Sequence, residues 1–170
     1  MNLILCGMMG GGKTTIGIKI AELTGRRWYD TDGLIVDKHG KISDIFEYYG
    51  EAHFRKLETE IVKELVKKDG LIISTGGGLV LKSENNALLQ ENGKIVFLRA
   101  TLETLAQRLK VDGERPLLQT STESIRDRLE RLMQERAPVY EHVADYIVDV
   151  DGKTPEAIAK EIVAVTGCER

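Results

Sequence analysis

The sequence contains few of the residues that mark disulfide-rich, metal-binding or membrane proteins. Its 170 residues include two cysteines, Cys6 and Cys168, whose positions suggest neither a disulfide framework nor a zinc site. The three histidines, His39, His53 and His142, have no ligand spacing, and we assign them no metal. No apolar run approaches the roughly 18 residues of a membrane span, and the amino terminus lacks the basic region of a secretory signal. We therefore expect a reduced, cytoplasmic protein that is neither exported nor inserted.

The sequence also lacks an excess of basic residues. Its formal net charge is -3 and its pI is near 5.7, so it offers no positive field to nucleic acid or to an anionic membrane surface. Any anionic substrate must then be bound by arginines at the binding site itself. With 42% hydrophobic residues, a chain of this length can bury one core. We expect a single domain spanning residues 1–170, acting as a monomer without nucleic-acid or membrane partners.

The pattern of apolar residues predicts an α/β fold. Short apolar runs predict five strands, and helical spacing predicts helices between and after them. This alternation favours a parallel sheet covered by helices on both faces, with ligands at the carboxyl ends of the strands. The polar, turn-rich stretch 110–121 is a candidate lid. The strands are expected at 3–6, 27–30, 71–74, 95–98 and 145–149, and the helices at 14–24, 43–49, 51–68, from about Ile125 to Arg136, and from Pro155 to Gly167.

The residues Gly7 to Thr14 match the phosphate-binding pattern G-x-x-x-x-G-K-[ST] between the first strand and the first helix. Its glycines let successive backbone N–H groups face one anion, and the helix adds its positive end. Lys13 is expected to reach the β- and γ-phosphates, and the Thr14 hydroxyl to ligate Mg²⁺. The sequence therefore predicts a nucleoside triphosphate site. Its residues are Gly10, Gly11, Gly12, Lys13, Thr14 and Thr15.

Two carboxylates, Asp30 and Asp32, follow the second strand. We expect them to point into one cleft from an extended loop, one holding Mg²⁺ through water and the other orienting the proton of an attacking hydroxyl. The alternative is a polar turn in which Asp32 caps a helix. The run Asp30 to Gly33 also fits the D-x-x-G of GTPases, but no Asn-Lys-x-Asp guanine motif is present.

Three further features favour an anionic substrate. Arg55 and Glu58 lie three apart on one predicted helix, so Glu58 can orient Arg55 toward a carboxylate; the alternative is an ordinary intrahelical ion pair. The run Thr75 to Gly78 offers bare backbone to a ligand, where a simple turn needs only one glycine. Arg115 in the candidate lid and Arg136 at a predicted helix end are separate cationic candidates, although for Arg136 alone a solvated helix end is sufficient explanation.

These motifs, in this order and spacing, resemble those of the shikimate kinase family over nearly the whole chain. The motifs are the phosphate loop, Asp-Thr-Asp at 30–32, Phe-Arg-x-x-Glu at 54–58, Thr-Gly-Gly-Gly at 75–78, Arg-Pro-Leu-Leu at 115–118 and Arg-Ala-Pro-x-Tyr at 136–140. The resemblance implies a three-layer αβα P-loop kinase fold with strand order 2-3-1-4-5. It also implies Mg²⁺-dependent transfer of the ATP γ-phosphoryl group to the 3-hydroxyl of shikimate, in chorismate and aromatic amino acid biosynthesis.

The resemblance also implies a role for each matching residue. Lys13 stabilises the transferring phosphoryl group, Thr14 ligates Mg²⁺ and Asp30 holds the water shell of the metal. Asp32 binds the shikimate hydroxyls and acts as the base. Arg55, in the shikimate-binding segment 33–62, and Arg136 clamp the carboxylate of shikimate. Gly77, flanked by Gly76 and Gly78, gives a backbone contact to the substrate. Arg115 is the lid arginine that closes on the phosphates.

Two nucleotide contacts depart from the family pattern or match it only by distance. Arg108 aligns by its separation from Arg115, and Lys153 stands where the family commonly has an arginine near the adenine. A lysine does not stack as a planar guanidinium does.

Two rival functions remain open at this point. Another small-molecule or nucleoside monophosphate kinase would need the same loop, lid and arginines, and fold alone does not separate these. A nucleotide-dependent switch without catalysis is opposed by the missing guanine motif and the presence of Asp32.

Overall fold

The computed structural model describes residues 1–112 and 124–169, and for residues 110–112 only the backbone. A five-stranded, wholly parallel sheet has the order β2-β3-β1-β4-β5. The prediction of a parallel sheet in this order is therefore confirmed. The strands are β1 (Asn2–Cys6), β2 (Trp28–Asp30), β3 (Ile72–Ser74), β4 (Gly93–Arg99) and β5 (Tyr146–Asp149).

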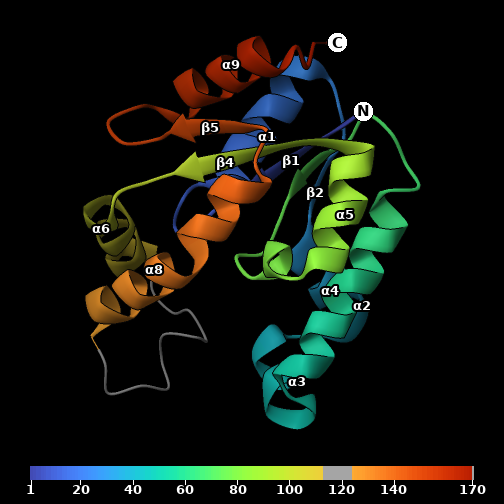
Figure 1. Ribbon diagram of the computed structural model, residues 1–170, viewed down its shortest axis with the longest axis vertical. Helices are drawn as coiled ribbons and strands as arrows, with labels where there is room; N and C mark the ends of the chain where they lie inside the picture. Colours follow the sequence, from blue (N-terminus) through green and yellow to red (C-terminus); the bar gives the residue numbers. More distant parts are fainter. Residues whose placement is uncertain (113–123, 170) are drawn as a thin grey trace.

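Helices cover both faces of the sheet (Figure 1). Helix α1 (Lys13–Thr24) packs beside α9 (Pro155–Thr166), while α5 (Ser83–Asn92) and α8 (Ile125–Val143) contact β4 from the opposite side. The three-layer prediction is thus confirmed. The other helical elements are α2 (Thr31–His39), α3 (Ile42–Tyr49), α4 (Glu51–Leu65), the short 3₁₀ turn η1 (Leu79–Leu81) and α6 (Leu102–Asp112).

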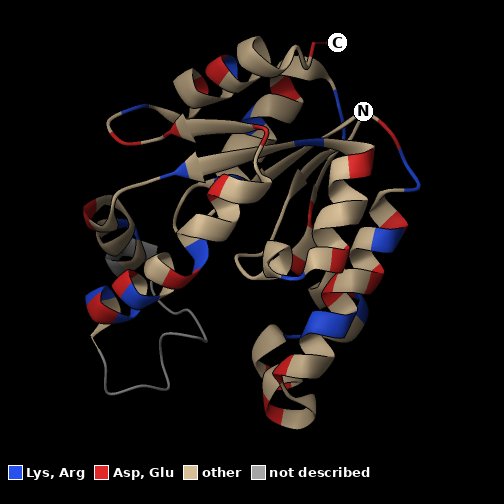
Figure 2. Cartoon of the chain, in the orientation of Figure 1, with Lys and Arg blue, Asp and Glu red and all other residues tan. Residues whose placement is uncertain are grey.

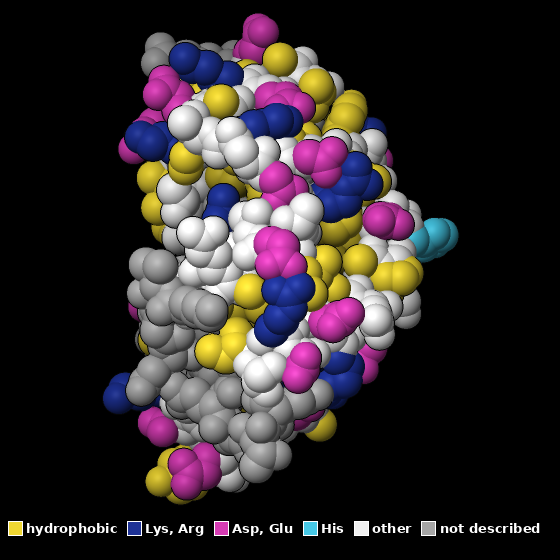
Figure 3. Space-filling model, turned by 90° about the vertical axis from the view of Figure 1, so that its left-hand side faces the viewer, with side chains coloured by type: hydrophobic (Ala, Val, Ile, Leu, Met, Phe, Trp, Pro, Cys, Tyr) yellow, Lys and Arg dark blue, Asp and Glu magenta, His cyan; other side chains and the backbone are white. Residues whose placement is uncertain are grey.

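The core follows from the apolar runs of the central strands. Every residue of β1 is buried, and Leu3 pairs with Ile72 on one side and with Lys94 on the other. Charged residues lie mainly on the outer helices, and the central strands carry few (Figure 2). On the face shown in Figure 3, acidic and basic side chains are interspersed, so neither sign forms a separate field there.

Among residues 1–112 and 124–169, no helix is both long and apolar enough to cross a membrane.

The structure corrects the expected extended loop after β2. Helix α2 begins at Thr31 directly after the strand, and Asp30, not Asp32, is its N-cap. The Asp30 carboxylate accepts hydrogen bonds from the backbone N–H groups of Asp32 (3.0 Å) and Gly33 (3.4 Å). A capping carboxylate satisfies N–H groups that the first helical turn leaves without partners, which is why the chain turns at once into a helix.

The structure also corrects the expected helix end at Arg136. Helix α8 continues to Val143 with Pro138 inside it. Proline removes one backbone hydrogen bond there. The buried side chains of Tyr140 and Val143 hold the last turns against the core, which offsets this loss.

Candidate active site

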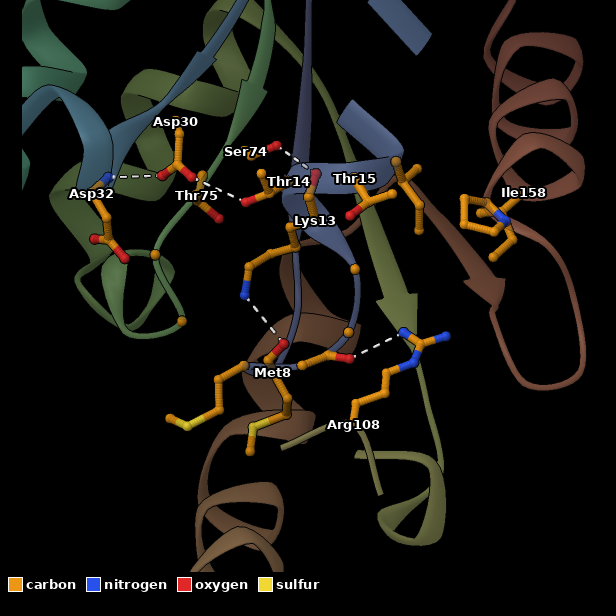
Figure 4. Close-up of a pocket in the computed structure, with 18 of the residues that line it drawn as sticks. Met8, Lys13, Thr14, Thr15, Asp30, Asp32, Ser74, Thr75, Arg108 and Ile158 are labelled. Atoms are coloured by element: carbon orange, nitrogen blue, oxygen red, sulfur yellow. Dashed lines mark hydrogen bonds between the residues drawn. The ribbon is translucent and has the colours of Figure 1, made fainter. Parts of the chain in front are cut away.

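The phosphate loop joins β1 to α1 and lines a cavity of about 650 Å³. Its backbone has positive φ at Gly10 (81°) and Gly12 (91°), a conformation that side chains disfavour. The Lys13 ammonium donates to the carbonyls of Gly7 (2.6 Å) and Met8 (3.2 Å), as Figure 4 shows in part. The loop, Thr15 and the start of α1 thus form one wall of a cavity suited to a triphosphate, which we call the nucleotide cavity.

The two aspartates lie on another wall of this cavity. The Thr14 hydroxyl donates to Asp30 at 3.1 Å, so the last residue of β2 meets the first turn of α1 (Figure 4). Hydroxyl and carboxylate oxygens are hard ligands of the kind that Mg²⁺ prefers, with water filling its other positions. The donor set of Thr14 and Asp30 therefore fits a magnesium ion held directly and through water. Asp32, in the first turn of α2, also lines the cavity.

A second cavity of about 160 Å³, which we call the acceptor cavity, adjoins the first. Arg55 from α4 and Arg136 from α8 lie on its walls together with Asp32. Arg136 is 6% exposed, so the alternative of a solvated helix end is wrong. The predicted substrate residues therefore meet in one place, and the lining residues are Met9, Asp32, Ile42, Phe46, Phe54, Arg55, Glu58, Gly76, Gly77, Gly78 and Arg136.

The three glycines after β3 each lie against one functional side chain. A Cβ atom at Gly76 would stand 2.6 Å from the Asp32 carboxylate, and one at Gly77 would stand 3.0 Å from the Arg136 guanidinium. At Gly78 it would stand 2.4 Å from the Arg55 guanidinium. Any side chain in this run would displace a charged group, so the run is more than a turn.

Arg55 is held by two acids of its own helix. Its guanidinium donates to Glu58 at 2.7 Å and to Glu51 at 3.2 Å. Burial raises the pKa of Glu58 to about 7, against the lowering effect of Arg55. Burial lowers the pKa of Arg55, but the charges of Glu58 and Glu51 and their hydrogen bonds to the guanidinium together outweigh this, so the net pKa is raised. The pair is thus an intrahelical ion pair, as one alternative had it, and Arg55 also lines the acceptor cavity; the orientation of Arg55 toward a carboxylate stays a prediction.

Tyr140 supports the glycine run from α8. Its buried hydroxyl donates to the carbonyl of Gly77, and its ring packs at 5.1 Å from that of Phe97. Burial raises the pKa of Tyr140 above its ordinary value, so the hydroxyl stays a donor at neutral pH. Gly77 is thereby fixed between Tyr140 and Arg136.

The predicted nucleotide residues outside the loop differ in their placement. Arg108 lines the nucleotide cavity and donates to the carbonyl of Gly10 at 3.0 Å. Lys153 pairs with Glu161 at 2.9 Å and is absent from the described lining. Arg115 and most of the predicted lid 110–121 lie outside the described residues.

Several lining residues were not predicted from the sequence. Pro155 and Ile158 line the nucleotide cavity, but the pattern around them indicated only a helix start. Phe46 and Phe54 form the apolar wall of the acceptor cavity with ring centroids 5.0 Å apart, and the sequence had marked Phe54 as the first residue of the Phe-Arg-x-x-Glu motif rather than as a lining residue. Met9, a variable position of the loop pattern, lines both cavities.

Comparisons with known proteins agree with this geometry. The family model "Shikimate kinase" matches residues 9–166. The chain is 43% identical to a shikimate kinase of Sulfurihydrogenibium sp. (strain YO3AOP1) over 162 residues, 95% of each chain. It is 42% identical to one of Caldicellulosiruptor bescii over 96% of this chain and 94% of the relative.

Solved structures give the same result. A shikimate kinase from Acinetobacter baumannii in complex with shikimate matches with a TM-score of 0.90 and 37% identity, covering 96% of this chain and 91% of the other. One from Aquifex aeolicus matches with a TM-score of 0.81 and 35% identity, covering 97% and 95%.

Proposed function

The chain belongs to the shikimate kinase family, and we propose that ATP occupies its nucleotide cavity and shikimate its acceptor cavity. The γ-phosphoryl group of ATP then passes to the 3-hydroxyl of shikimate, giving shikimate 3-phosphate and ADP on the way to chorismate and the aromatic amino acids. The observation that carries this assignment is the wall that both cavities share. It consists of Met9, Asp32, Gly76 and Gly77.

On the nucleotide side, the backbone of the loop and the Lys13 ammonium bind the phosphates. The ammonium exchanges its contacts with the carbonyls of Gly7 and Met8 for phosphate oxygens. Thr14 and, through water, Asp30 would hold Mg²⁺, which would supply positive charge to neutralise the phosphates. Arg108, on the cavity wall beside the loop, faces the nucleotide from α6.

On the acceptor side, Arg55 and Arg136 bind the carboxylate of shikimate. Both guanidinium groups line a small cavity with apolar rings behind it, where charge-assisted hydrogen bonds are stronger than in water. Glu58 keeps Arg55 in place, and Gly77 offers its backbone N–H. The hydroxyls of the ring then face Asp32.

The reaction needs little covalent work from the protein. The shikimate oxygen bonds to the γ-phosphorus, the bond to the β–γ bridging oxygen breaks, and the hydroxyl proton passes to Asp32. Lys13 stabilises the charge that spreads over the transferring group, so positioning and electrostatics carry most of the acceleration.

Further assignments complete the proposal. The segment 33–62 binds shikimate, since Ile42, Phe46 and Arg55 from it line the acceptor cavity. By the family resemblance, the segment 110–121 is the lid and Arg115 closes on the phosphates. The described residues of one chain line both cavities, which supports a monomer, and the unpaired thiols of Cys6 and Cys168 support a cytoplasmic location.

The substitution Asp32→Asn tests the proposed base. We expect MgADP binding by calorimetry to be unchanged and transfer to fall by about 100-fold or more, because general base catalysis is removed. Asp37→Asn is the matched control, since Asp37 is exposed on the same helix and outside both cavities. An active Asp32→Asn enzyme would remove Asp32 from the mechanism.

A further inference from the structure

Trp28, the single tryptophan of the sequence, takes part in a hydrogen-bonded chain that ends in the phosphate loop. Its indole Nε1–H donates to the Ser74 hydroxyl oxygen at 3.0 Å. The Ser74 hydroxyl in turn donates to the backbone carbonyl of Lys13 at 2.6 Å, the contact drawn in Figure 4. Ser74 is 1% exposed at the carboxyl end of β3. The chain therefore connects β2, β3 and the first residue of α1.

Gly17 shows how closely α1 packs against the hydrogen-bonded side chains of Trp28 and Ser74. A Cβ atom at Gly17 would stand 2.5 Å from the Ser74 hydroxyl oxygen and 2.5 Å from Trp28 Nε1. Real Cβ atoms do not approach that closely, so only glycine admits both side chains against the first turns of the helix. The contact is thus a close fit among three elements.

The direction of each bond matters for what the chain does. A serine hydroxyl has one hydrogen and accepts through its lone pairs. Ser74 gives its hydrogen to the Lys13 carbonyl, and the indole N–H occupies an acceptor site on the same oxygen. The indole therefore fixes the rotation of the hydroxyl, and hydrogen bonds in such a chain strengthen one another.

The same helical turn carries the two groups that meet the nucleotide. Lys13 supplies the ammonium, and the next residue, Thr14, donates its hydroxyl to Asp30 at 3.1 Å. Asp30 stands two residues after Trp28 on β2. The first turn of α1 is thus tied to the sheet twice, once through the side chain of Thr14 and once through the backbone of Lys13.

We propose that Trp28 is a positioning residue for the phosphate loop, acting through Ser74 to hold the first turn of α1 where Lys13 and Thr14 meet the phosphates and Mg²⁺. This inference rests on the proposed nucleotide site. A purely structural tryptophan would instead affect stability and leave the nucleotide affinity unchanged.

Three variants separate these roles by calorimetric titration with MgADP. Trp28→Phe keeps an aromatic ring and removes the N–H, and we expect the dissociation constant to rise about threefold; Ser74→Ala removes both bonds, and we expect a rise of about tenfold. Because the indole acts through Ser74, the double variant binds no more weakly than Ser74→Ala alone. Shikimate affinity stays unchanged in all three.

Tyr29→Phe is the matched control on the same strand. The ring of Tyr29 lies beside the Lys68 ammonium. We expect removal of the Tyr29 hydroxyl to leave the MgADP affinity unchanged. The inference would be overturned if the fold-change in the MgADP dissociation constant of the double variant equalled the product of the two single fold-changes. An unchanged affinity in Trp28→Phe would also overturn it. If the wild-type protein itself does not bind MgADP, the proposed nucleotide site fails instead, so the two failures are distinguishable.

The emission of Trp28 gives a second readout that does not depend on the Phe variant folding. In the wild-type protein, MgADP changes this emission more than shikimate does, because the indole is two hydrogen bonds from the loop. The MgADP response is lost in Ser74→Ala. A response of equal size in the wild type and in Ser74→Ala would contradict the proposed connection.

Discussion

Arg55 and Glu58 form a partly buried ion pair on the wall of the acceptor cavity. Glu58 is 1% exposed, and one of its carboxylate oxygens has no hydrogen-bond partner among the described residues. Burial is costly for an ionised carboxylate, and the positive charges of Arg55 and Arg136 only partly offset that cost. The pair therefore favours a well-oriented guanidinium at some cost in stability.

Glu58→Gln should change the pH dependence of folding. Below pH 4.5 Glu58 is protonated in both states; between about 4.5 and 7 the unfolded chain loses this proton while the folded protein keeps it, so rising pH favours unfolding. From these pKa values the effect is roughly 3 kcal/mol at most. The free energy of unfolding of Glu58→Gln, measured in urea, should improve relative to the wild type across that window. A difference that is constant with pH would mean that Glu58 does not titrate there.

Arg136→Ala should raise the KM for shikimate far more than the KM for ATP. Removing a charge-assisted contact costs about 1.5 to 3 kcal/mol, or roughly 10- to 150-fold in KM. Initial-rate kinetics with each substrate varied in turn measure both constants. Arg131→Ala, an exposed arginine of the same helix, is the control and should change neither. Equal effects on both constants would assign Arg136 to the nucleotide site.

At the scale of elements, helix α1 depends on one glycine for its approach to the sheet. Gly17→Ala gains up to about 1 kcal/mol of helix propensity, but the new methyl group overlaps Ser74 and Trp28, which costs about 1 to 3 kcal/mol. We expect a net loss of stability in urea unfolding, together with weaker MgADP binding. Gly33→Ala in α2 is the control, because its methyl group meets the Asp30 Cβ at an ordinary 3.5 Å. A Gly17→Ala protein as stable as the wild type would show that the packing relaxes freely.

Some elements were predictable from the sequence and others were not, for physical reasons. The central strands were predicted because buried parallel strands require continuous apolar runs, and the phosphate loop because its glycines and lysine serve a local function. Helix α2 was predicted only as an alternative and with Asp32 as its cap, because its true start depends on the Asp30 side chain turning back to cap it. The end of α8 was missed because Pro138 indicates a stop, while the burial of Tyr140 in the core overrides it.

The same distinction applies to the site. The predicted substrate residues follow strands or sit in local motifs, and the structure brings them together around the acceptor cavity. The burial that raises the pKa of Glu58 and the position of Phe46 in the cavity wall both depend on tertiary packing. A local sequence pattern does not predict such packing. Pro155 reaches the nucleotide cavity from the far edge of the sheet for the same reason.

At the scale of the whole molecule, the sheet brings two cavities to the carboxyl ends of its strands, with Asp32 on the wall between them. In our proposal, the loop after β1 binds the nucleotide and the glycine run after β3 contacts the acceptor. Because β1 and β3 are neighbours in the sheet, the two segments that follow them lie side by side, and the proposed substrate sites adjoin. The arrangement predicts that phosphoryl transfer depends on both cavities being filled.

The most direct measurement is ADP release by the purified protein with MgATP, comparing no acceptor, shikimate, gluconate and nucleoside monophosphates, with phosphorus NMR of the product. The account predicts little ADP without an acceptor, rapid release with shikimate alone among these, and a new phosphate monoester in equal amount. ADP release that shikimate does not change, or that another acceptor promotes equally, would contradict the assignment of the acceptor cavity.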